Sequence, residues 1–165
     1  MPDTLKLDDI KMKSPRPKTS ILIIQISSII GLLDSTYLAY VKAAKAPVYC
    51  TPGLGNCDVV NASRWSELFG IPLGFYGIAG FGLIFALTTL GFRKRLIPQY
   101  IDLAIFGFSL AGFLFSLYLT SIEIFVLKTY CQWCILSAIM MSMIFVTIII
   151  RLVVKSPSTT ATGGD

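Results

Sequence analysis

Two cysteines separated by two residues, Cys131 and Cys134, stand where a polar turn gives way to a long apolar run. At the start of a helix, thiols three positions apart lie about one turn from each other, so their sulfurs can close a small disulfide or share one thiolate. The helix dipole stabilises an anion there by only ~0.3–1 kcal/mol at exposed sites, whereas lowering the pKa of a thiol by one unit needs about 1.4 kcal/mol. The helix start alone would therefore make the thiol only mildly acidic. Alone, the pair is a moderate signal, because half a zinc site or two inert thiols have the same spacing.

The composition indicates a membrane protein. Of the 165 residues, 55% are hydrophobic, and the mean hydropathy is +0.74, which is too apolar for an ordinary soluble domain. The chain has no histidine, so its chemistry must use cysteine, carboxylate, hydroxyl or a bound cofactor. The net charge of +5 does not indicate a nucleic-acid partner, because the basic residues cluster at the ends of apolar runs, as membrane orientation requires.

Four apolar runs are long enough to cross ~30 Å of hydrocarbon at about 20 residues each. They cover residues 19–41, 71–91, 99–122 and 131–154. The sequence therefore predicts an all-α integral membrane protein whose four-transmembrane-helix bundle occupies residues 19–154. A polar tail, residues 1–18, precedes the bundle, and we expect a disordered tail at residues 155–165.

The basic residues predict the orientation of the bundle. Ten of them lie in the N-terminal tail, in the turn at 93–95 and at the end of the last run, whereas four lie on the opposite side. The positive-inside rule then places both termini in the cytoplasm. All four cysteines fall on the outer face (periplasmic, extracellular or lumenal), where disulfides persist.

The outer loop, residues 42–70, holds the second pair of cysteines. Cys50 and Cys57 flank a turn-rich stretch whose proline and glycines allow them to meet at the ~5.5–6 Å Cα separation of a disulfide. After them, residues 58–69 alternate apolar and polar side chains at roughly helical spacing, which predicts a short amphipathic helix in the membrane interface.

One cysteine pair in a polar loop and another at a helix start, on the same side, is typical of a dithiol relay. The loop pair can exchange with a soluble protein, while the helix pair faces a lipid-soluble oxidant between the helices. Two alternatives use the same residues. In the first, one pair forms a structural disulfide and the other pair is inert, so the protein is a non-catalytic membrane scaffold. In the second, the four cysteines bind zinc as thiolates, since their number matches the four ligands of a structural zinc site. We expect no metal.

The chain resembles the vitamin K epoxide reductase family, motif by motif, across nearly its whole membrane-spanning length. The matching segments, in order, are Tyr37-Leu-Ala-Tyr-Val-Lys-Ala-Ala-Lys45 at the exit of the first helix, the loop pair Cys50 and Cys57, Ser63-Arg64-Trp65, Tyr118-Leu119, and the pair Cys131 and Cys134. The resemblance implies a four-helix bundle that encloses a quinone of the menaquinone, ubiquinone or vitamin K type. It also implies that quinone reduction is coupled to disulfide formation in a thioredoxin-like partner on the outer face.

The resemblance also implies roles for individual residues. Cys50 would be the thiol that the partner engages, and Cys57 would pass electrons to Cys131. Cys134 would lie nearest the quinone. A hydroxyl can donate or accept a hydrogen bond, and Ser63 would use this capacity toward the quinone or the reacting thiolate, unless it is a plain surface serine. The quinone pocket would be lined by Tyr37, Phe75, Leu119 and Leu127, whose alternative role is ordinary packing.

Two departures from the family pattern bear on the activity. Vertebrate members place a tyrosine one turn beyond the second redox cysteine, where this chain has Ala138. This departure counts against reduction of a quinone epoxide, which is the alternative to thiol oxidation by a quinone. Many microbial members carry a fused thioredoxin-like domain, whereas this chain ends soon after its fourth run, so we expect a separate partner protein.

Two carboxylates lie within the expected helices, Asp34 in the first and Glu123 in the third. An unpaired charge near the middle of a membrane costs ~2.5–3.5 kcal/mol on insertion scales, so such residues usually face the bundle interior or reach the interface. In the interior they would supply protons during quinone reduction. At the interface they would only contact water.

The predicted orientation can be tested with a membrane-impermeant maleimide. Applied from outside to intact cells whose disulfides have been reduced, the reagent should label Cys50 and Cys57, because the positive-inside rule places their loop outside. The readout is the mass shift of the purified chain. Labelling that requires permeabilised membranes would reverse the orientation.

Overall fold

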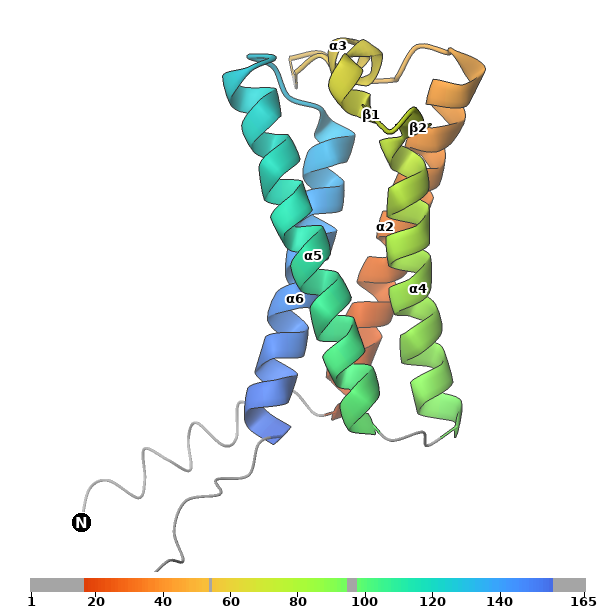
Figure 1. Ribbon diagram of the computed structural model, residues 1–165, viewed down its shortest axis with the longest axis vertical. Helices are drawn as coiled ribbons and strands as arrows, with labels where there is room; N and C mark the ends of the chain where they lie inside the picture. Colours follow the sequence, from red (N-terminus) through yellow and green to blue (C-terminus); the bar gives the residue numbers. More distant parts are fainter. Residues whose placement is uncertain (1–16, 54, 95–97, 156–165) are drawn as a thin grey trace, which may run out of the picture.

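The computed structural model describes residues 17–53, 55–94 and 98–155, and four long helices run along its length (Figure 1). They are α2 (Pro17–Ala44), α4 (Leu73–Lys94), α5 (Pro98–Phe125) and α6 (Gln132–Lys155). All four are long and apolar enough to cross a membrane. The predicted helical membrane bundle is confirmed, and each helix boundary lies within three residues of the expected one.

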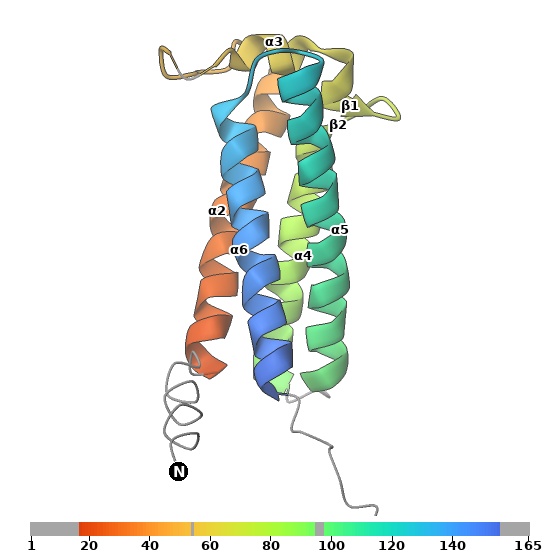
Figure 2. The ribbon, with the colours of Figure 1, turned by 90° about the vertical axis from the view of Figure 1, so that its left-hand side faces the viewer.

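The start of α2 and the end of α6 lie at the same end of the bundle, and the segment between α2 and α4 covers the other end (Figures 1 and 2). This arrangement follows from an even number of crossings. The predicted tails lie outside the described residues, apart from residues 17, 18 and 155, which belong to α2 and α6.

The covering segment contains a short helix, as expected, but the helix is shorter than the sequence pattern suggested. Helix α3 spans Cys57–Ala62 and is followed by a 3-10 helix, Arg64–Ser66. The expected continuation to residue 69 is instead a hairpin, in which β1 (Glu67–Leu68) pairs antiparallel with β2 (Ile71–Pro72). Its turn residues, Phe69 and Gly70, have φ of 55° and 79°, the left-handed values that tight two-residue hairpin turns require.

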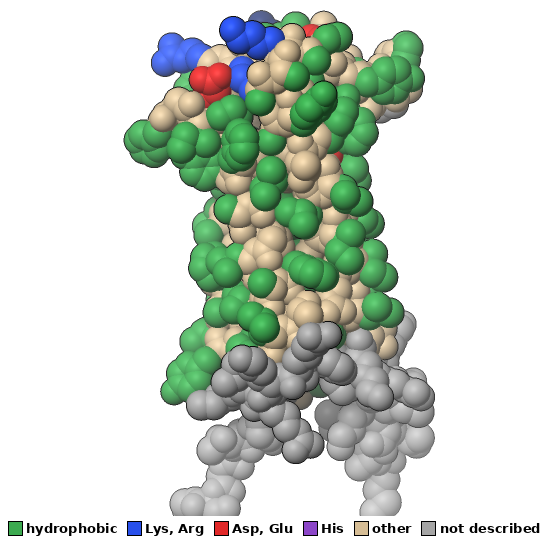
Figure 3. Space-filling model, turned by 90° about the vertical axis from the view of Figure 1, so that its right-hand side faces the viewer, with side chains coloured by type: hydrophobic (Ala, Val, Ile, Leu, Met, Phe, Trp, Pro, Cys, Tyr) green, Lys and Arg blue, Asp and Glu red, His purple; other side chains and the backbone are tan. Residues whose placement is uncertain are grey.

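The long helices present apolar side chains outward. Figure 3 shows hydrophobic side chains along one face of the bundle, with lysine and arginine gathered at the covered end. Each of the four helices has exposed leucine or isoleucine side chains, as expected of surfaces that contact lipid rather than water.

Small residues bring α2 and α4 close together. A Cβ atom added to Gly74 would lie 2.6 Å from the backbone nitrogen of Ala39, and one at Gly31 would lie 2.5 Å from the Phe81 ring. Gly70 and Gly107, in contrast, have open space beside them. The buried apolar core of the bundle comprises Ile24, Phe81, Ile84, Ile105, Met141, Ile144 and Ile148.

Candidate functional site

The loop cysteines form a disulfide at the covered end of the bundle. Cys50 and Cys57 have a Cα separation of 5.9 Å. Cys57, the first residue of α3, is 0% exposed, whereas Cys50 is only partly buried. The helix start is fixed by Asn56, whose side chain accepts a hydrogen bond from the backbone of Val59. A soluble molecule that attacks this disulfide therefore reaches Cys50 more easily than Cys57.

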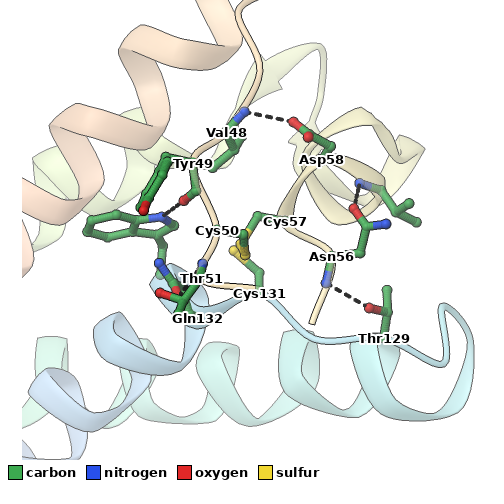
Figure 4. The surroundings of a disulfide bond; sticks show 12 residues. Val48, Tyr49, Cys50, Thr51, Asn56, Cys57, Asp58, Thr129, Cys131 and Gln132 are labelled. Atoms are coloured by element: carbon green, nitrogen blue, oxygen red, sulfur yellow. Dashed lines mark hydrogen bonds between the residues drawn. A yellow bond between two sulfur atoms is a disulfide. The ribbon is translucent and has the colours of Figure 1, made fainter. Parts of the chain in front are cut away.

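Hydrogen bonds hold the loop against the start of α6 (Figure 4). The backbone nitrogen of Asn56 donates to the Thr129 hydroxyl at 3.1 Å, and that of Thr51 donates to the Gln132 side chain at 3.2 Å. On the other side, the Trp133 indole donates to the Tyr49 carbonyl at 2.8 Å. Consequently the disulfide lies over α6.

Cys131 lies directly beneath the disulfide, and Figure 4 shows its side chain pointing toward the two bonded sulfurs. It is 1% exposed and shares a buried cluster with Cys57, Val48 and Val60. Cys131 and Cys134 are free thiols in this structure. The structure thus combines an oxidised loop pair with a reduced helix pair.

Glu123 connects the end of α5 to the redox pair. Its side chain is buried, with 3% exposure. One carboxylate oxygen accepts a hydrogen bond from the Cys131 backbone nitrogen at 3.1 Å, and the carboxylate lies beside the Cys134 thiol. The Glu123 carbonyl accepts from the Thr129 backbone at 3.1 Å. The same residue therefore fixes the turn before α6 and contacts both members of the pair.

The surroundings of Cys131 favour its thiolate. The hydrogen bond from the Cys134 thiol lowers the pKa of Cys131 below the usual value of a thiol, and the backbone amides of Trp133 and Cys134 act in the same direction. Burial opposes the shift. Amides at a helix start commonly stabilise a thiolate in this way.

Two neighbouring cavities meet at Cys134. The first, here called the outer cavity, has about 60 Å³ and lies beneath the covering segment. The second, the bundle cavity, has about 470 Å³ and lies between the four long helices. Both are lined by Leu38, Leu73, Gly74, Leu119 and Cys134. Cys134 therefore has access to a compartment within the bundle, whereas Cys131 lines the outer cavity.

The structure brings several of the other predicted site residues to these cavities. Ser63 and Leu127 line the outer cavity, and Leu119 lines both. The Ser63 hydroxyl donates to the Val60 carbonyl at 2.7 Å, which leaves its oxygen available as an acceptor.

Tyr37 and Phe75 lie elsewhere. The Tyr37 ring packs against Trp133 with centroids 4.7 Å apart, and its hydroxyl accepts from the Tyr49 backbone at 3.1 Å. Phe75 is 47% exposed and is not among the residues that line either cavity. In this structure Tyr37 supports the loop that carries Cys50.

Sequence reasoning missed two polar residues. Lys42 donates to the Asn61 carbonyl at 2.6 Å and the Ser66 hydroxyl at 2.8 Å, and pairs with Glu67 at 3.3 Å. It thereby ties α2 to the covering segment. Ser137, one turn beyond Cys134, lines the bundle cavity and donates a hydrogen bond to Asp34. Ser137 could have been found from the sequence, because it lies one helical turn after Cys134. Nothing in the sequence distinguished Lys42 from an ordinary basic residue at a helix end.

Comparisons with known proteins agree with this geometry. Residues 22–149 match the family described as the vitamin K epoxide reductase family. A protein of Arabidopsis thaliana named thiol-disulfide oxidoreductase LTO1 is 34% identical over 58 residues, which are 35% of this chain and 15% of that protein. The chain therefore aligns with a small part of this relative.

The acidity of Cys131 can be measured through its reaction with iodoacetamide, while the loop disulfide stays intact. We expect the pH midpoint of its alkylation to lie below that of an ordinary thiol, because the Cys134 thiol donates a hydrogen bond to the thiolate. Cys134→Ala should move the midpoint to higher pH, and Cys134→Ser, which keeps a donor, should move it less. Equal midpoints in both variants would contradict this assignment.

Proposed function

Because this chain belongs to the vitamin K epoxide reductase family, a family of oxidoreductases that use quinones, we propose that it oxidises a thioredoxin-like protein and passes the electrons to a quinone held within the bundle. The observation that carries the proposal is the relative position of the loop disulfide, Cys131 and Cys134. The loop disulfide lies over Cys131, and Cys134 opens onto the bundle cavity.

The first exchange takes place at Cys50. A thiolate of the thioredoxin-like protein attacks the Cys50 sulfur, forms a mixed disulfide and expels Cys57 as a thiolate. The second thiol of that protein then attacks its own sulfur in the mixed disulfide and releases Cys50. The protein leaves as a disulfide, and Cys50 and Cys57 hold its two electrons. The burial of Cys57 favours this order.

The second exchange transfers these electrons to the helix pair. The Cys57 thiolate attacks Cys131 in a Cys131–Cys134 disulfide and expels Cys134, after which Cys50 closes the loop disulfide again and releases Cys131. The products are an oxidised loop pair and a reduced helix pair, which is the state of this structure. The acidic character of Cys131 makes it a good leaving group in this closing step.

The bundle cavity suits a quinone. Its volume of about 470 Å³ is in the range of small-molecule sites, and its lining is mainly apolar with a few hydroxyl groups. The apolar side chains, including Leu119, Leu73 and Phe115, would hold the ring, and Ser63 and Leu127 would lie toward the outer cavity. A bound quinone of the menaquinone, ubiquinone or vitamin K type accepts two electrons and two protons.

The side chains around Cys134 prepare the dithiol for oxidation. Glu123, which lies beside Cys134, takes up the proton of that thiol. Cys134 then donates electrons as a thiolate toward the bundle cavity, and the Cys131 sulfur closes the disulfide. In the membrane, we place the covered end of the bundle on the outer face and both termini in the cytoplasm, supported by the distribution of basic residues.

Turnover with two reductants tests this division of labour. The purified protein should reduce a soluble quinone analogue with either a reduced thioredoxin-like protein or dithiothreitol. Cys50→Ser should lower turnover with the protein to background, because the entry thiol is gone. It should leave turnover with dithiothreitol largely intact, because a small reductant can attack the helix pair at Cys134, which is only partly buried, without using Cys50. Quinone absorbance gives the rate in both cases.

The matched control is Thr51→Ser, which changes the neighbouring exposed side chain and should keep both activities. Equal loss of both activities in Cys50→Ser would contradict the relay order. A wild-type protein that reduces no quinone with either reductant would contradict the proposed function itself.

A further inference from the structure

Asp34 is a buried carboxyl group that the scheme above does not use. It lies in α2 and is 4% exposed. One oxygen, Oδ2, accepts a hydrogen bond from the Ser137 hydroxyl of α6. The other, Oδ1, is buried and has no hydrogen-bond partner among the described residues. Buried polar atoms nearly always have a partner, so an exception calls for a specific explanation.

Ser137 links this carboxyl to the redox pair. It lies three residues beyond Cys134 on α6, and both residues line the bundle cavity. Residues three apart on a helix share a face, so Ser137 and Cys134 face the same cavity. Asp34 itself is not among the lining residues. Its contact with the cavity therefore runs through the Ser137 oxygen.

Resting on the proposed function, we propose that Asp34 and Ser137 form a proton-transfer pair that protonates an oxygen of the quinone as Cys134 supplies electrons. A serine hydroxyl can donate one hydrogen bond and accept two. Asp34 can hold its proton on Oδ1, which has no other partner, while Ser137 donates to Oδ2. For the transfer, the Ser137 hydroxyl turns its proton from Asp34 to the quinone oxygen and accepts the carboxyl proton of Asp34 in its place.

The electrons balance within the pair of thiols, and the protons balance when Asp34 is included. Oxidising the Cys131 thiolate and the Cys134 thiol to a disulfide releases two electrons and one proton, whereas one quinone consumes two of each. Asp34 lends one proton through Ser137, and Glu123 passes on the one that it took from Cys134. The thiols of the reductant lose two protons when they are oxidised: one reprotonates Cys134 and the other, taken up from the aqueous outer face, restores Asp34 before the next cycle.

A purely structural hydrogen bond between α2 and α6 predicts different behaviour. Asp34→Asn retains an acceptor oxygen for Ser137 and is nearly isosteric, but it cannot carry a transferable proton. A structural role would therefore survive this change, whereas proton transfer would not. Ser137→Thr retains the hydroxyl, and Ser137→Ala removes it. Ser142 is a matched control, because it lies on the same helix and donates to its own helix carbonyl, Ala138, at 2.7 Å.

The test measures quinone reduction by dithiothreitol in these variants. General acid catalysis typically contributes 10²–10⁴-fold, so Asp34→Asn and Ser137→Ala should slow quinone reduction by about 10²-fold or more. Ser137→Thr should recover most of the rate, and Ser142→Ala should match the wild type. Thiol exchange between the two cysteine pairs, followed by mass after alkylation, should stay unchanged in every variant.

A second readout does not depend on turnover. Infrared difference spectra between the oxidised and reduced protein with quinone added should contain carbonyl-stretch signals of protonated carboxyl groups, one from Asp34 and one from Glu123. Asp34→Asn should remove the first signal and leave the second, and Ser137→Ala should shift only the first. Wild-type rates in Asp34→Asn, with an unchanged infrared signal, would overturn this inference alone. A wild-type protein without quinone reduction would overturn the proposed function together with it.

Discussion

The hydrogen bond from the Cys131 backbone to the Glu123 carboxylate is the contact on which the redox end of this protein depends. An isolated charge within a membrane costs ~2.5–3.5 kcal/mol on insertion scales, whereas a hydrogen bond to a charged group contributes ~1.5–3 kcal/mol. The bond from the Cys131 amide to Glu123 can therefore offset much of the cost of burying this carboxylate. In return, the carboxylate fixes where α6 begins, and so where both thiols lie.

The covering segment completes this arrangement from the opposite direction. Lys42 holds it to α2, while the Thr129 and Gln132 side chains hold it to the turn and helix that carry Cys131. The loop disulfide is thus fixed over a thiol that another set of contacts has fixed from below. The proposed thiol exchange requires direct approach of one sulfur to another, and the two sets of contacts hold the loop disulfide and Cys131 in one buried cluster.

Much of this fold could be predicted from the sequence, because the length of each apolar run decides whether a helix can cross the membrane. The two cysteine pairs and their common side also followed from the pattern. The rotation of each helix about its own axis could not be predicted, since α4 and α5 carry no polar stripe that would identify an inner face. For this reason Phe75 was expected to line the quinone pocket, although it lines neither cavity. The contact between Asp34 and Ser137, which are 103 residues apart, was not predicted for the same reason. The hairpin at 67–72 was missed because its left-handed turn includes Phe69, a residue that rarely adopts positive φ.

The central claim is that Cys134 donates electrons to a quinone in the bundle cavity, and the visible spectrum of Cys131→Ser tests it most directly. This variant keeps the backbone amide that binds Glu123, but Cys134 can no longer be resolved by its neighbour. A Cys134 thiolate against a bound quinone should then accumulate and produce a charge-transfer band when quinone is added to the purified protein. Cys134→Ser should lack the band. Absence of the band in Cys131→Ser, together with full turnover in Cys134→Ser, would show that Cys134 is not the electron donor.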